Sequence, residues 1–141
     1  MEPVHPVPDH LRTVTPRLVV RNASDAISFY VAAFGAGEIG ERVIGPHDEV
    51  IHAELRIGDA VVMITEDVGD VDAPAKSPDS LGGSVSAIMV TYWEDVDVVW
   101  ERAVACGAEV IMPIADQFYG ERGGRLRDPF GQQWMLSQRI A

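Results

Sequence analysis

The segment DAISFYVAAFGA at residues 25–36 returns as DVVWERAVACGA at residues 97–108, with aspartate, glycine and alanine in register. A run with strand character precedes each copy, at residues 15–20 and 87–91. Solenoids stack three or more short units, so two copies in a short chain predict a single pseudo-symmetric domain instead. We expect the functional cleft where the two halves face each other.

The pattern of apolar residues and turn signals predicts the order strand-helix-strand-strand-strand twice. Module one spans about residues 13–65 and module two about residues 85–137, and a polar linker at about 66–84 joins them. Residues 1–12 form a proline-rich lead that we expect to run extended, with His5 and His10 in solvent. The 141 residues therefore predict one domain of the α+β class.

Both predicted helices carry capping signals. Asn22 or Ser24 can cap the first helix, and Gly35 supplies a left-handed exit. Asp95 or Asp97 can cap the second helix.

Residues 50–57 alternate between apolar and polar side chains, which predicts a strand with two different faces. One face is expected to hold Ile51, Ala53, Leu55 and Ile57, and the other His52, Glu54 and Arg56. His52 and Glu54 then point toward the concave side, at a spacing that allows two donors to reach one ion. The alternative is that the polar set forms a hydrogen-bonded or ion-paired lining, as buried charges usually do.

The formal net charge of −11 argues against a nucleic-acid partner, because phosphate binding needs clusters of Lys and Arg. Such a charge favours the approach of cationic small molecules, or simply keeps the protein soluble. We expect no membrane partner, because no apolar run approaches the roughly 20 residues of a membrane helix. The N-terminus lacks the features of a signal peptide. Cys106 is the single cysteine, which fits the reducing cytoplasm, and we expect it to be a small core residue.

Several motifs occur in an order that is typical of one superfamily. They are TVTPRLVV at 13–20, FGA at 34–36, HAEL at 52–55 and GERGGRLRDPFG at 120–131, with Trp134 following. This sequence resembles the vicinal oxygen chelate superfamily of glyoxalases, bleomycin-resistance proteins and dioxygenases, and within it the PhnB-like branch. The resemblance covers nearly the whole chain. It implies two tandem β-α-β-β-β modules whose curled mixed sheets surround a shared cleft, and a homodimer, possibly with exchanged modules.

Catalytic members of that superfamily hold a divalent metal with His, Gln or Glu from four strands. The resemblance carries these positions to Thr15, Val62 or Met63, Ala87 or Ile88, and Met135. These side chains do not supply the oxygen and imidazole donors that Zn²⁺, Mn²⁺ or Fe²⁺ requires. We therefore expect no metal and no other cofactor.

The cleft is expected to be lined by Thr15, Arg17, His52, Glu54, Met63, Met89, Tyr119, Arg122 and Trp134. The glycine-rich turn at residues 120–124 is expected to present Arg122 and Arg125. These residues predict a metal-independent protein that binds a small, partly aromatic or cationic organic ligand. The alternative is a glyoxalase-type lyase or isomerase, or another enzyme of the superfamily. It would use His52 and Glu54 as catalytic residues, through a displaced divalent metal or by acid–base chemistry. A third class is an interaction module whose cleft is filled by side chains.

Overall fold

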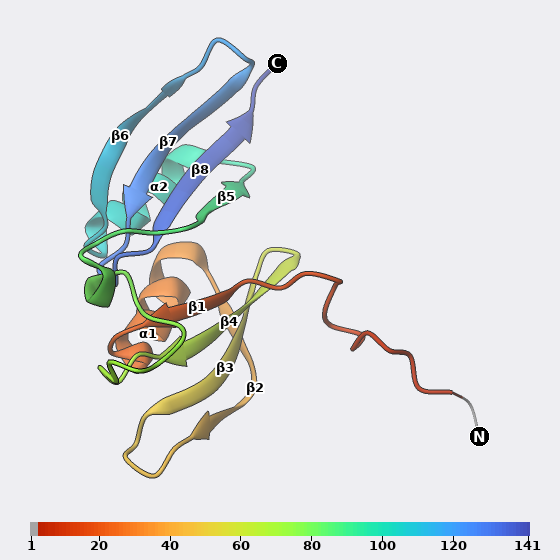
Figure 1. The fold of residues 1–141 in the computed structure, drawn as a ribbon. Coiled ribbons are helices and arrows are strands. Elements are labelled where there is room, and N and C mark those ends of the chain that lie inside the picture. Colours follow the sequence, from red (N-terminus) through yellow and green to blue (C-terminus); the bar gives the residue numbers. More distant parts are fainter. Residues whose placement is uncertain (1–2) are drawn as a thin grey trace.

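The computed structural model describes residues 3–141 and arranges them as two modules of the same design (Figure 1). Module one consists of β1 (Arg17–Val20), α1 (Ala23–Phe34), β2 (Gly37–Ile44), β3 (Val50–Ile57) and β4 (Ala60–Glu66). Module two consists of β5 (Ile88–Tyr92), α2 (Val96–Ala105), β6 (Glu109–Asp116), β7 (Glu121–Arg127) and β8 (Gln133–Arg139). One 3-10 turn, η1 (Asp79–Leu81), lies in the linker. The predicted α+β class with two tandem modules is confirmed.

Each module folds into a mixed four-stranded sheet with the same strand order. The orders are β1-β4-β3-β2 and β5-β8-β7-β6, and the first strand of each module runs parallel to its last. The other neighbours are antiparallel, as short turns require. The two sheets remain separate and do not close into a barrel.

The two helices cover one side of the sheets and also pack against each other. On β7, Gly124 allows a close approach, because a Cβ atom there would lie 2.6 Å from the ring of Trp100 on α2. The apolar core runs through both modules without a break. We call the side of each sheet away from its helix the open face.

A buried carboxylate joins the two modules. The hydroxyl of Tyr30 on α1 donates to Asp128 Oδ2 at 2.6 Å, and the indole N–H of Trp134 on β8 donates to the same oxygen at 2.9 Å. The backbone N–H groups of Phe130 and Gln132 donate to Oδ1 at 2.9 and 3.0 Å. Burial raises the pKa of Asp128, while these four hydrogen bonds act in the opposite direction. Module one thus supplies a donor that a buried charge in module two requires.

Aromatic packing follows the same junction. The ring centroid of Trp134 lies 5.4 Å from that of Tyr30 and 4.8 Å from that of Phe34. The side-chain amide of Gln132 also crosses the junction and donates to the carbonyl of Val19 on β1 at 3.0 Å. The relative position of the modules is therefore set by both polar and apolar contacts.

The cap of α1 differs from the prediction. Asn22 occupies the N-cap position, but its backbone is left-handed (φ 53°) and its side chain makes no capping bond. The side chain of Glu66 takes that role, accepting from the N–H of Ala23 at 3.2 Å. The sequence could not show this cap because Glu66 lies far along the chain, at the end of β4. The predicted cap of α2 by Asp95 is confirmed.

The alternation of β3 is interrupted at one residue. Val43 pairs with His52 and Ile44 with Val50, so Ile51 is an extra residue in a β-bulge. Ile51 is exposed as a result, and Val50 is buried in its place. The rest of the strand alternates as predicted, with its polar side chains on the open face.

The linker is held against module one by Asp67. Its carboxylate accepts from the hydroxyls of Ser77 and Ser80 at 2.6 and 2.7 Å and from the N–H groups of Ser77 and Gly69. The serine hydroxyls above all hold the pKa of Asp67 well below its usual range.

Cys106 was predicted to be a small core residue, and this is wrong. It follows the last turn of α2 and is exposed.

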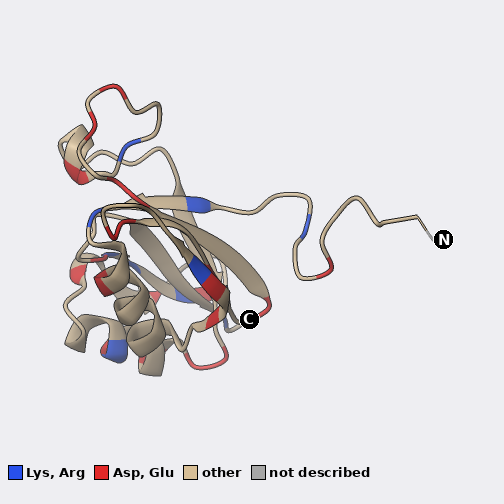
Figure 2. Cartoon of the chain, turned by 90° about the horizontal axis from the view of Figure 1, so that it is seen from below, with Lys and Arg blue, Asp and Glu red and all other residues tan. Residues whose placement is uncertain are grey.

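Acidic residues are spread over the loops and the helices (Figure 2). Among the described residues, no helix is long and apolar enough to cross a membrane.

The Tyr30→Phe variant should lose about 2 kcal/mol of unfolding free energy, because the buried Asp128 carboxylate loses a charge-assisted donor. Urea unfolding measures this loss. Tyr92→Phe is the matched control, since that hydroxyl also donates to a carboxylate, Glu121, but at the surface. It should cost much less, and equal losses in the two variants would contradict the role of Asp128.

Candidate functional site

A cavity of about 530 Å³ lies at the junction of the modules, between the β3–β4 turn and β5. Its walls are mainly apolar and come from Pro16, Ile57, Val61, Val62, Ile88, Met89, Val90, Trp93 and Trp134. Three polar or charged residues, Asp59, Thr91 and Tyr92, also belong to its lining. Of the predicted site residues, the structure brings Met89 and Trp134 together here.

Trp93 is a wall of the cavity that the sequence analysis missed. Its indole N–H donates to the hydroxyl of Thr91 at 2.7 Å, and that hydroxyl donates to the carbonyl of Met135 at 2.8 Å. Its ring also packs against Phe34 of module one, with a centroid distance of 5.9 Å. A tryptophan directly after a strand was the available signal, but its contact with module one depends on the tertiary fold.

The open face of sheet one carries other predicted residues in one row across the strands. Arg17 on β1 is opposite Met63 on β4, Met63 is opposite Glu54 on β3, and Glu54 is opposite Ile39 on β2. The guanidinium of Arg17 donates to the carbonyl of Ile51 at 3.1 Å. Thr15 precedes β1 and is not among the residues that line the cavity.

Two imidazoles bind the carboxylate of Glu54. His10 Nε2 lies 2.8 Å from one carboxylate oxygen, and His52 Nε2 lies 3.3 Å from the other. Hydrogen bonding to His10 and then to His52 holds the pKa of Glu54 below its usual value. The prediction that His10 lies in solvent is therefore wrong, because its ring is partly buried against Glu54 even though the lead extends away from the sheets (Figure 1). A contact across 44 residues has no local sequence signal.

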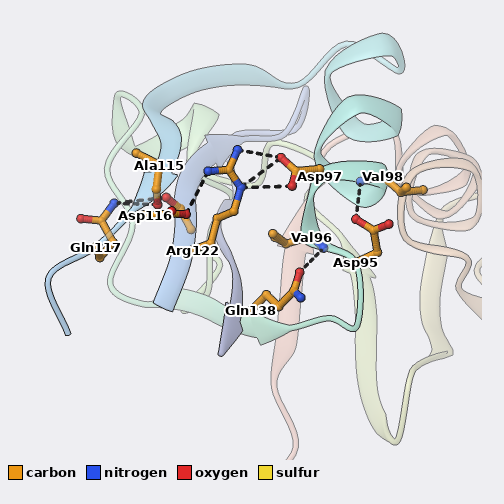
Figure 3. A network of polar contacts seen from close by, with 10 residues as sticks. Asp95, Val96, Asp97, Val98, Ala115, Asp116, Gln117, Arg122 and Gln138 are labelled. Carbon is orange, nitrogen blue, oxygen red and sulfur yellow. Dashed lines mark hydrogen bonds and ion pairs between the residues drawn. The ribbon is translucent and has the colours of Figure 1, made fainter. Parts of the chain in front are cut away.

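Arg122 and Tyr119 lie elsewhere. Arg122 is directed toward α2, where Nε and Nη2 donate to Asp97 and Nη1 donates to Asp116 at 3.1 Å (Figure 3). These bonds raise the pKa of Arg122 above its ordinary value. Tyr119 lies in the β6–β7 turn beside Phe118, half exposed and outside the lining of the cavity.

The positions that hold the metal in catalytic relatives do not fit a metal here. Met63 and Met135 lie on the open faces of two different sheets, and their thioethers are poor ligands for hard divalent ions. Across residues 3–141, no three His, Cys, Asp or Glu side chains lie close enough together to hold a metal ion.

Comparison with protein families gives a match to the glyoxalase/bleomycin resistance protein/dioxygenase superfamily over residues 8–136. Among individual proteins, the uncharacterized protein Mb0911c of Mycobacterium bovis is 44% identical over 128 residues, which cover 90% of this chain and 83% of that protein.

Solved structures with the same fold include TioX from Micromonospora sp. ML1, with a TM-score of 0.67 and 23% identity over 92% of this chain and 98% of TioX. A PhnB protein from Bacillus cereus has a TM-score of 0.64 and 21% identity, over 90% of this chain and 99% of that protein. At this level of identity the two structures support the fold alone.

The pKa of Glu54 tests the contact with His10. NMR titration of the carboxyl carbon should give a value below that of an ordinary glutamate, and His10→Ala should raise it more than His52→Ala does. Since folding lowers this pKa, the hydrogen bonds stabilise the fold above the unfolded pKa, and that contribution is lost as the pH falls through the folded value. A pKa unaffected by His10→Ala would show that His10 does not contact Glu54.

Proposed function

We propose that this chain, which belongs to the glyoxalase/bleomycin resistance protein/dioxygenase superfamily, binds a small organic molecule between its modules without a metal ion. The cavity at the module junction carries this proposal. Its volume of about 530 Å³ lies in the range of ligand pockets, which combine apolar walls with a few polar groups. Trp93 and Trp134 offer aromatic surface for a ring of the ligand.

We further propose that a second copy of the chain packs against the open faces and leaves space for a ligand between the copies. These faces expose apolar side chains, with Val43 at 50%, Val90 at 53% and Tyr92 at 61% of their full accessibility. Apolar groups gathered on one side of a sheet favour association. The linker spans more than twenty residues between β4 and β5, which is enough for exchange of modules between copies.

A cytoplasmic location agrees with the free and exposed thiol of Cys106, because the cytoplasm keeps such thiols reduced.

An enzyme is the second candidate, favoured by the two imidazoles on Glu54. Histidines hydrogen-bonded to a carboxylate can act as a general base or acid. The binding protein and the enzyme differ in what happens to the bound molecule. A binding protein releases it unchanged, whereas an enzyme converts it to a product.

Nile red, an uncharged apolar dye that fluoresces when it leaves water, should bind the cavity. Met89→Trp fills the cavity with an indole ring and should abolish the fluorescence increase. Val110→Trp adds the same ring to the exposed edge strand β6 and should leave dye binding intact. No fluorescence increase with the unaltered protein, or an equal increase with Met89→Trp, would contradict ligand binding in this cavity.

Light scattering should give a mass twice the 15.3 kDa of the chain. Val43→Glu places a charge on the open face of sheet one and should produce monomers. Val98→Glu is the control, since Val98 has nearly the same exposure, 48%, but lies on α2. A monomeric native chain, or equal behaviour of the two variants, would exclude the open faces as the dimer interface.

A further inference from the structure

Arg125 lies at the centre of the open face of sheet two with no partner. It stands in one row with Val90 on β5, Met135 on β8 and Met112 on β6. Its Nε is buried and has no hydrogen-bond partner within residues 3–141. None of the ion pairs formed in the described part of the chain includes its guanidinium. A cation half-buried between two methionines is therefore left without a counter-charge.

Arg127 follows on the same face of β7. Its Nη1 lies 3.1 Å from a carboxylate oxygen of Glu109, but its Nε is also buried and unpartnered in residues 3–141. Residues two apart on a strand are spaced by about 7 Å. The face thus holds two neighbouring guanidinium groups. Of its carboxylates, Glu109 pairs with Arg127, and Glu121, four residues from Arg125 on the strand, accepts from the hydroxyl of Tyr92.

Arg122, on the other face of the same strand, provides a comparison. Two carboxylates, those of Asp97 and Asp116, surround its guanidinium. The chain contains 22 acidic and 11 basic residues, so acidic partners are abundant. The missing counter-charge at Arg125 is therefore a local feature of the open face.

We propose that Arg125 and Arg127 bind the anionic group of the ligand, so that the molecule held by this protein is an organic anion. This inference rests on the proposed function and specifies its ligand class. The planar fork of arginine donates two parallel hydrogen bonds to a carboxylate, sulfonate or phosphonate group, and these groups share the required chemistry.

The position of Arg125 also limits the shape of the ligand. Val90, in the same row, lines the cavity at the module junction. Two interstrand spacings, about 10 Å, separate the two residues, with Met135 between them. The ligand therefore combines an anionic end at Arg125 with an apolar body that lies over Met135 and reaches toward Val90 at the edge of the cavity. This class differs from the cationic ligand that the net charge of −11 favours.

Phenylphosphonate, benzylamine and benzyl alcohol test the inference, because they present the same ring with a negative, a positive and no charge. Titration followed by NMR should show a saturable shift of the Arg125 Nε–H signal with phenylphosphonate, and binding should weaken with added salt. Arg125→Gln should weaken phenylphosphonate binding by about tenfold or more. Arg102→Gln removes the same charge from the exposed side of α2 and should change the affinity less than about twofold.

Equal binding of benzylamine, or unchanged phenylphosphonate binding in Arg125→Gln, overturns the inference. A shift from dimer to monomer in Arg125→Gln with unchanged phenylphosphonate affinity would assign Arg125 to a carboxylate of a second copy, and this also overturns it. Nile red separates the two proposals. If the dye binds the cavity and phenylphosphonate does not bind, the anion site fails while the cavity stands. If Nile red fails as well, the proposed function is lost.

Discussion

A carboxylate without solvent must receive hydrogen bonds, and Asp128 can receive its full set only when the two modules are docked. Tyr30 comes from module one, and Trp134 comes from module two. Trp134 also forms a wall of the cavity. The same contact that joins the modules therefore helps to fix the shape of the space between them. Changes at the junction reach the site through two indole rings, those of Trp134 and of Trp93, which both pack against Phe34.

The sequence predicted the features that depend on local patterns. The repeat predicted two modules, and the alternation of residues 53–57 predicted which side chains of β3 face away from the helix. Contacts between distant segments were not predictable. His10 in the lead contacts Glu54 on β3, and Glu66 caps a helix that begins far earlier in the chain.

The arginines Arg122 and Arg125 show how far the sequence alone predicts which side chains face the site. The two residues are three apart on β7, so they face opposite sides of the sheet. Leu126 and Gly124 alternate with Arg125 and Arg127, which indicates the parity of the strand once its bounds are known. Without those bounds, either arginine of the glycine-rich turn was a possible ligand-binding residue. The sequence analysis placed Arg122 in the cleft, but Arg122 is bonded to Asp97 on α2.

The two faces of β7 differ in how strongly the fold constrains their residues, and this affects how ligand preference can change among members of the family. One face is fixed to α2 by Arg122 and by Gly124 beneath Trp100, while the other carries Arg125, which has no structural partner in residues 3–141. Insertion or deletion of one residue within the strand would exchange the two faces and disrupt the fold. Substitution at Arg125 carries no such cost. Single substitutions on the open face of β7 can therefore change the ligand preference. The residues on the α2-facing side must stay the same for the protein to fold.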